Sequence, residues 1–290
     1  MSSQSAASLE LPAPTAVVTR VGRREVFLWV VICLFANQAL LLVDTGSYGA
    51  FAASLAQQNY IYWFACYVVI YRLYASDKAT RANRFDCGLA LAICGAIFFT
   101  SLLPYRFGIG LVVTITAGYF LAAHHGDRNI KAAGAVLLAI SMHLVWGPIF
   151  FQLFTPELLR ADAALVGEIL TSLRPDIIWS NNSFHAPDGH SVSLIAGCSS
   201  FNNVSTAVLA CATIAMLTRT EWVRRDIATV VIASVVMVLV NAIRLCLIAW
   251  SGPLHLFWHD GAGAQILGIA QTLVILLVAW WGAAPRRHQA

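Results

Sequence analysis

Long apolar runs dominate this chain and restrict what it can fold into. Eight runs come close to the roughly 20 mostly apolar residues that a helix needs to cross a bilayer. They cover residues 26–43, 61–75, 85–103, 107–123, 132–154, 199–217, 227–250 and 264–281. Only 11% of the residues are charged, against about 25% in a typical soluble domain. The sequence therefore predicts an all-α polytopic membrane protein with about eight transmembrane helices.

The basic residues fall mainly on one side of this predicted arrangement. With eight helices, the loops of one side and the two ends of the chain contain Arg20, Arg23, Arg24, Arg72, Lys78, Arg81, Arg84, Arg128, Lys131, Arg219, Arg224, Arg225, Arg286 and Arg287. The other side contains only Arg106, Arg160 and Arg174. Because basic loops stay in the cytoplasm, we expect both termini to be cytoplasmic. We also expect a multipass plasma membrane protein of the bacterial inner membrane, with its site facing the periplasm.

The predicted domain organisation is simple. Residues 1–19, rich in Ser, Ala and Pro, read as a disordered cytoplasmic tail. Residues 20–290 form a single membrane-embedded domain with one long outer loop, 155–197. In this loop, residues 156–173 have a helical apolar pattern with acidic residues between, which predicts an amphipathic helix on the outer surface. A Pro187-Asp188-Gly189 turn separates two extended runs, so a short β-hairpin is expected before Cys198.

Cys198 differs from the other six cysteines. Those six show no CxxC spacing and lie in apolar runs or close to a predicted membrane boundary, where a cysteine is usually a small buried hydrophobe. Cys198 lies among small and polar residues at the predicted outer start of the helix 199–217. A helix N-terminus favours the reactive thiolate, and Ser199 and Ser200 are natural capping residues. Cys198 is therefore a candidate nucleophile.

Two further candidates lie at the same predicted height. Arg244 is the remaining basic residue, inside the helix 227–250, where an arginine costs about 2.5–3.5 kcal/mol and suggests a functional role. His259 follows that helix in an outer loop that also contains His255 and Asp260. Since neighbouring helices pack about 8–10 Å apart, Cys198, Arg244 and His259 are placed to converge. Asn241 precedes Arg244 by one turn and is a candidate to orient its guanidinium.

His143 lies near the middle of the helix 132–154, where it is expected either to bond a neighbouring helix or to reach the site. The basic residues form no stripe or arm, so nucleic-acid binding is not expected. Neither a metal nor another cofactor is predicted.

Three short motifs in this order resemble the exosortase/archaeosortase family of multipass membrane cysteine proteases and transpeptidases. They are "GCSS" opening a helix, "NAIR" in the next helix, and "HDGAG" after it. The resemblance implies that Cys198 is the nucleophile and that Arg244 and His259 complete the catalytic set, with Gly263 four positions on. His255 fits the spacing to this glycine less well. Ser200 stands where the family usually has glycine, which suggests a divergent subfamily.

The resemblance also implies a substrate. It would be an exported protein with a C-terminal sorting signal, made of a short motif, a membrane helix and a basic tail. The enzyme would cleave it at the outer face through a Cys thioester and transfer it to an amine or water, often in systems linked to surface anchoring or exopolysaccharide. A transporter component and a non-catalytic membrane scaffold are the alternatives, although a transporter would more often carry paired acids inside its helices.

Overall fold

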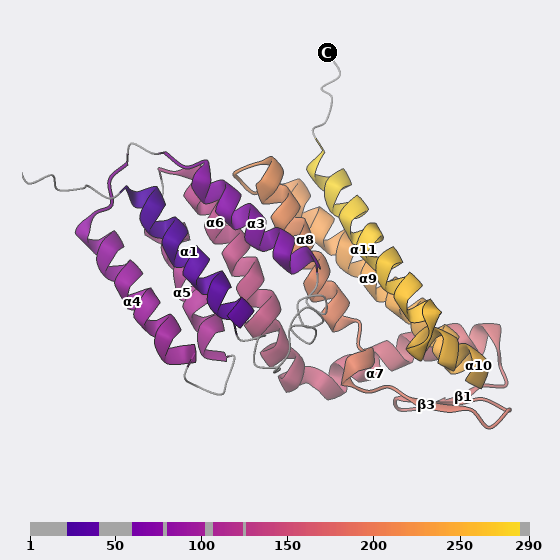
Figure 1. Ribbon diagram of the computed structural model, residues 1–290. Coiled ribbons are helices and arrows are strands. Elements are labelled where there is room, and N and C mark those ends of the chain that lie inside the picture. The colour runs from indigo at the N-terminus through magenta and orange to yellow at the C-terminus, as the bar shows by residue number, and fades with distance from the viewer. Residues whose placement is uncertain (1–21, 41–59, 78–79, 102–106, 124–125, 285–290) are drawn as a thin grey trace, which may run out of the picture.

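The computed structural model describes residues 22–40, 60–77, 80–101, 107–123 and 126–284, and most of them are helical (Figure 1). Each of the eight apolar runs contains a helix, and the described helix ends lie within a few residues of the prediction except for the end of the run 132–154, which lies inside α7. The helices are α1 (Arg23–Leu40), α3 (Tyr60–Tyr74), α4 (Arg84–Ser101), α5 (Phe107–Ala123), α6 (Arg128–Ser141), α8 (Phe201–Thr218), α9 (Arg224–Trp250) and α11 (Ala262–Ala283). The predicted disordered tail, residues 1–19, lies outside the described residues.

Four described helical segments are long and apolar enough to cross a membrane: Arg128–Leu173, Phe201–Thr218, Arg224–Trp250 and Ala262–Ala283. The apolar part of α5, Gly108–Ala122, is shorter. Large apolar side chains of α11 point outward and are exposed, among them Ile266, Ile269, Leu273 and Leu277. Water would disfavour such a surface, whereas lipid solvates it. The chain is thus a membrane protein, and the number of eight spans stays a prediction.

The helix after α6 differs from the prediction of a span followed by a separate surface helix. A π-helical turn, η1 (Met142–Trp146), joins α6 to α7 (Gly147–Leu173) without a loop. A kink at Phe154, two residues before Pro156, changes the direction of α7. Proline causes such kinks because it lacks an N–H and clashes with the preceding turn. Beyond the kink, α7 crosses one end of the helix bundle (Figure 1).

The predicted β-hairpin is a three-stranded antiparallel sheet. Its strands are β1 (Ile178–Ser180), β2 (Ser183–His185) and β3 (Ser191–Ser193), in the order β1-β2-β3. The first predicted run contains a turn of its own, because Asn181 adopts a positive φ of 53°. Asparagine tolerates this conformation better than most residues. The second turn contains Gly189 (φ 83°) and lies in the predicted place.

A small apolar core, separate from the core of the helix bundle, holds the sheet, α7 and the end of α9 together. It contains Leu159, Ala163, Val166, Leu170, Ile177, Phe184, Ala186, Leu194, Ala242, Leu245, Cys246 and Ala249, and Cys198 packs against it. Gly167 allows the close approach, because a Cβ there would lie 2.4 Å from the Trp179 ring. His190 donates from Nε2 to the carbonyl of Ile248 (3.0 Å). The segment before Cys198 is thereby fixed against α9.

The opposite end of the bundle is rich in arginine. The buried Arg72 guanidinium donates to the carbonyls of Met216 and Leu217 at the end of α8 (2.6 and 2.9 Å). Arg225 at the start of α9 donates to the carbonyl of Ala284 after α11 (2.8 Å). Cations at helix C-termini satisfy carbonyls that lack a partner in the helix. These contacts hold together the ends of α3, α8, α9 and α11.

Candidate active site

Cys198 does not lie at a helix start, as the sequence suggested, but in a tight turn before one. A short 3₁₀ helix, η2 (Ala196–Cys198), is followed by Ser199 in an extended conformation, and α8 begins only at Phe201. The thiol is half-buried. We call residues 196–200 the cysteine turn. Its curvature, rather than the axis of α8, sets the direction of the Cys198 side chain.

The backbone N–H groups from Cys198 to Phe201 all donate within the protein. The N–H of Cys198 donates to the carbonyl of Ile195 (2.8 Å), and that of Ser199 donates to Ala196 (3.3 Å). The N–H of Phe201 donates to the Ser199 hydroxyl (3.2 Å). Ser199 therefore caps α8, whereas Ser200 occupies the N-cap position without a side-chain cap bond. The turn leaves its Cys198 and Ser199 amides unavailable to a ligand unless it rearranges.

Asn241 holds the cysteine turn from the side of α9. Its Nδ2 donates to the carbonyl of Cys198 (2.9 Å), and its Oδ1 accepts from Asn203 (3.3 Å). Asn241 is 1% exposed. The structure shows no hydrogen bond between Asn241 and Arg244, and the bonds of the Asn241 amide go to α8 and to the turn before it; the orientation of Arg244 by Asn241 stays a prediction.

Asp162 of α7 holds the turn from the other side, and the sequence reasoning missed it. Its Oδ2 accepts from the Ser199 hydroxyl (2.9 Å) and the Ser200 N–H (3.0 Å), and its Oδ1 accepts from the Ser200 hydroxyl (2.6 Å). A signal was present in the sequence. Asp162 lies three residues after Leu159 and four before Val166, so it shares the buried apolar face of α7.

Arg244 lies one turn after Asn241 on α9 and is half-buried. It forms no hydrogen bond or ion pair with any residue that the structure describes. A guanidinium carries five donors and stays protonated. Arg244 is thus a cation whose donors are not taken up by the described part of the protein.

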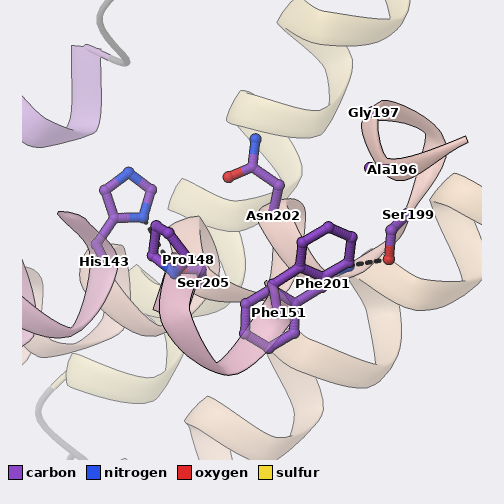
Figure 2. A pocket seen from close by; sticks show the side chains of 9 residues that line it. All are labelled: His143, Pro148, Phe151, Ala196, Gly197, Ser199, Phe201, Asn202 and Ser205. Atoms are coloured by element: carbon purple, nitrogen blue, oxygen red, sulfur yellow. Dashed lines mark hydrogen bonds between the residues drawn. The ribbon is translucent and has the colours of Figure 1, made fainter. Parts of the chain in front are cut away.

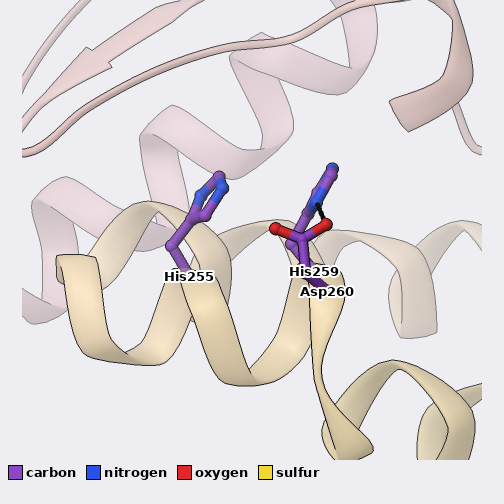
Figure 3. A group of neighbouring side chains, drawn as sticks. All are labelled: His255, His259 and Asp260. Carbon is purple, nitrogen blue, oxygen red and sulfur yellow. Dashed lines mark hydrogen bonds and ion pairs between the residues drawn. The ribbon is translucent and has the colours of Figure 1, made fainter.

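His259 lies in a second π-helical turn, η3 (Leu256–Asp260), which follows the short α10 (Gly252–His255). Its Nδ1 donates to Asp260 Oδ1 (2.6 Å), and both side chains are partly exposed (Figure 3). This bond leaves Nε2 as the nitrogen with a free lone pair. A histidine held in one tautomer by a carboxylate suits general base and acid chemistry.

His255 is placed differently from His259. Its ring stacks on that of His259 (centroids 5.0 Å apart, 14° between planes), and its Nδ1 is buried without a partner among the described residues. The pKa of His255 is lowered from its ordinary value, first because burial disfavours the imidazolium and then because His259 and His190 lie close. The described residues show no hydrogen bond that joins the Cys198 thiol, the Arg244 guanidinium and either imidazole.

His255, His259 and Asp260 also have the residue types of a metal site. One ligand atom from each lies within 4.8 Å of the other two. The Asp260 carboxylate is already the partner of His259, and two of the three side chains are exposed. This arrangement is explained by orientation of the imidazole, and we assign no metal to it.

A pocket of about 190 Å³ adjoins the cysteine turn, with Ala196, Gly197 and Ser199 on one wall (Figure 2). Phe151 and Phe201 supply an apolar wall. His143 of η1 lies in the pocket wall and shares a hydrogen bond with Ser205 of α8 (2.8 Å). The expected bond to a neighbouring helix is therefore present, and a role of His143 in the site itself stays a prediction.

Gly263 has a steric role next to His259. A Cβ at this position would lie 2.7 Å from the rings of Phe257 and Trp258. Only glycine lets the first turn of α11 pack this closely on η3 without a shift of these rings. The spacing between His259 and Gly263 thus reflects the packing of the turn that carries the histidine.

The comparison with known families decides what kind of protein this is. The model of the transmembrane exosortase family matches residues 25–276. The chain belongs to the transmembrane exosortase family. No curated protein and no solved structure matches it. Exosortase membership supports a general role as a membrane protease or transpeptidase, and the match includes Cys198, Arg244 and His259.

Proposed function

We propose that this exosortase is a cysteine transpeptidase or protease that cleaves C-terminal sorting signals of exported proteins at the outer face of the membrane. The observation that carries the proposal is the cysteine turn. It holds a half-buried thiol between α7 and α9 by side chains from both helices, in a chain that belongs to the exosortase family. A cysteine with only a packing role would not need this support.

The proposed orientation places the cysteine turn outside the cytoplasm. Cys198 precedes α8, and Arg219 follows the 18 residues of this helix. At 1.5 Å per residue the two ends of α8 are about 27 Å apart, close to the hydrocarbon thickness of about 30 Å. Because the arginine-rich end is expected in the cytoplasm, the cysteine turn, the sheet and His259 face outward. In a bacterium this would be the periplasmic side of the inner membrane.

The proposed reaction proceeds through a thioester. His259 takes the proton of the Cys198 thiol, and the thiolate attacks the scissile carbonyl to form a tetrahedral oxyanion. Collapse of this intermediate breaks the C–N bond, and His259 returns the proton to the leaving amine. An acceptor amine or water then attacks the thioester and releases Cys198. The acceptor decides whether the outcome is transpeptidation or hydrolysis.

Arg244 is the proposed donor to the oxyanion. Cysteine peptidases commonly need N–H donors where this charge develops. The N–H groups of Cys198, Ser199, Ser200 and Phe201 are already donated within the protein, whereas Arg244 has no partner among the described residues. Arg244 lies one helical turn beyond the asparagine that binds the Cys198 carbonyl. Its guanidinium is therefore the best available source of positive charge for this step.

The proposed substrate follows from the family resemblance. It is an exported protein that ends in a short motif, a membrane helix and a basic tail. Such a helix would approach through the lipid and bring the scissile bond to the outer interface. A link to surface anchoring or to exopolysaccharide export is proposed on the same ground.

The direct test is capture of the covalent intermediate. Cells that contain the chain and an epitope-tagged candidate substrate are quenched in acid, and the chain is analysed by mass spectrometry. The expected result is an adduct on Cys198 that neutral hydroxylamine removes, and that is absent from the Cys198→Ala protein. Processing of the substrate through an adduct on another cysteine would contradict the assignment of Cys198.

The two stacked histidines should differ in their contribution to catalysis. Loss of a general acid and base typically lowers a rate about 10²- to 10⁴-fold, and we expect this for His259→Ala, measured as initial rates of substrate processing across pH. His255→Ala should change the rate by no more than about threefold, because His255 stacks on His259 without taking part in the proposed proton transfer. A larger loss with His255→Ala than with His259→Ala would reverse the assignment.

A further inference from the structure

The residues after the nucleophile are anchored to a carboxylate from a distant part of the chain. Asp162 is 38 positions before Ser200, and its carboxylate accepts all three hydrogen bonds described above from Ser199 and Ser200. Asp162, Ser199 and Ser200 are all buried. No Lys, Arg or His forms an ion pair with Asp162 within the described ranges. The carboxylate thus depends on these two serines for its polar contacts.

The contacts of Asp162 restrain the backbone directly after Cys198. Ser199 is extended (ψ 143°), so the chain must straighten between η2 and α8. The Asn241 amide holds the carbonyl of Cys198, and Asp162 holds the next two residues. Together they restrain the backbone on the C-terminal side of the nucleophile, while the thiol itself is left out of the network. Such supporting hydrogen bonds fix a reactive side chain to within a fraction of an ångström.

We propose that Asp162 is a positioning residue for Cys198 and that Ser200 is its principal partner. This inference rests on the proposed function for its effect on catalysis. It also gives the serine at position 200 a physical role, since a glycine there would keep the backbone N–H bond to Asp162 and lose the hydroxyl bond. Asp162 and Ser200 then restrain the cysteine turn together. A chain with glycine at this position would need another contact in place of the hydroxyl bond.

The test uses the full-length protein in detergent and in cells. Asp162→Asn and Ser200→Ala are compared with Glu157→Gln, which changes an exposed acid on the same helix. Because a displacement of about 1 Å can cost 10²-fold in rate, Asp162→Asn should lower kcat for processing about 10- to 100-fold with little change in KM. Ser200→Ala should have a smaller effect in the same direction. The double variant should be no slower than Asp162→Asn alone, because both changes remove the same contact.

A second measurement separates positioning from a general loss of structure. The rate of alkylation by iodoacetamide is followed separately at Cys198 and at the buried Cys211 of α8 by peptide mass spectrometry. Local opening exposes groups without global unfolding, so Asp162→Asn should speed alkylation of Cys198 about threefold or more while Cys211 stays protected. Loss of positioning is expected to slow processing and to speed alkylation at Cys198 alone. A uniformly unfolded protein would be alkylated faster at Cys211 as well.

Three results would overturn the inference. The first is an Asp162→Asn protein that processes substrate and alkylates at the rates of Glu157→Gln. The second is a pair of observations. Cys211 is alkylated together with Cys198 in the Asp162→Asn protein, and the Ser200→Ala protein processes substrate normally while its Cys211 stays protected. The third is a double variant whose loss is the product of the two single losses. Alkylation needs no substrate, so it remains informative even if the Cys198→Ala protein processes normally and the proposed function fails.

Discussion

Replacement of Cys198 by alanine is expected to abolish processing of exported proteins that carry C-terminal sorting signals. Removal of a nucleophile typically costs a factor on the order of 10⁴ to 10⁶ in rate, so the uncleaved precursor should accumulate with its C-terminal helix intact. The protein itself should reach normal levels, because Cys198 is half-buried and only one sulfur atom is lost. The measurement is the size of the C-terminal fragment of candidate substrates in membranes.

The control for this experiment is Cys87→Ala, which changes an exposed cysteine of α4. It should process substrate at the wild-type rate. Normal processing by the Cys198→Ala protein would contradict the proposal that the chain is an enzyme and would favour a membrane scaffold or a transporter component. The mass of the wild-type product also separates an amine acceptor, which adds mass, from hydrolysis by water.

Replacement of Arg244 by glutamine is expected to lower the rate of processing about 10²- to 10³-fold, the usual cost of removing an oxyanion donor. Arg244→Lys should recover part of this loss, since it keeps the charge but not the planar set of donors. The rates are measured as appearance of cleaved substrate in membranes that contain equal amounts of each variant.

Alkylation of Cys198 distinguishes two ways in which Arg244 can act. If the guanidinium stabilises the oxyanion, Arg244→Gln slows processing and leaves iodoacetamide alkylation unchanged, because alkylation forms no oxyanion. If it stabilises the thiolate, both rates fall together. Arg160→Gln is the matched control, since Arg160 is an exposed arginine on α7. A wild-type rate of processing in Arg244→Gln would remove Arg244 from the catalytic set.

Much of the helical architecture could be predicted because apolar runs of sufficient length have few alternatives in a bilayer. The predicted run 107–123 coincides with α5, and the others agree within a few residues where the structure describes their ends, apart from the end of the run 132–154, which lies inside α7. The continuous helix from α6 through η1 to α7 could not be read from hydropathy, because hydropathy reports the length of an apolar run and not a π-helical turn or a change of helix direction. The extra turn at Asn181 was hidden for a similar reason, since one residue with positive φ suffices to make it.

The candidate site shows the same division. Cys198 and Arg244 were chosen as candidates from residue type and predicted depth, because an arginine inside a bilayer is costly and Cys198 lies among small and polar residues at a loop-to-helix boundary. The side chains that hold the cysteine turn were not predicted, and the hydrogen bonds of Asn241 go to residues that the sequence did not suggest. Spacing along one helix suggested Arg244, whereas the amide turned to the carbonyl of Cys198, 43 positions away.

The sequence by itself determined that this chain is a helical membrane protein of exosortase type, with its arginines gathered at one end and a cysteine, an arginine and a histidine as candidates at the other. Membrane spans and their orientation depend on local hydrophobicity and charge, which can be read directly from the order of residues. Only the tertiary structure decided that Asp162 and Asn241 hold the turn that carries Cys198. A hydrogen bond depends on distance and direction to within a few tenths of an ångström, and packing of α7, α8 and α9 alone supplies both.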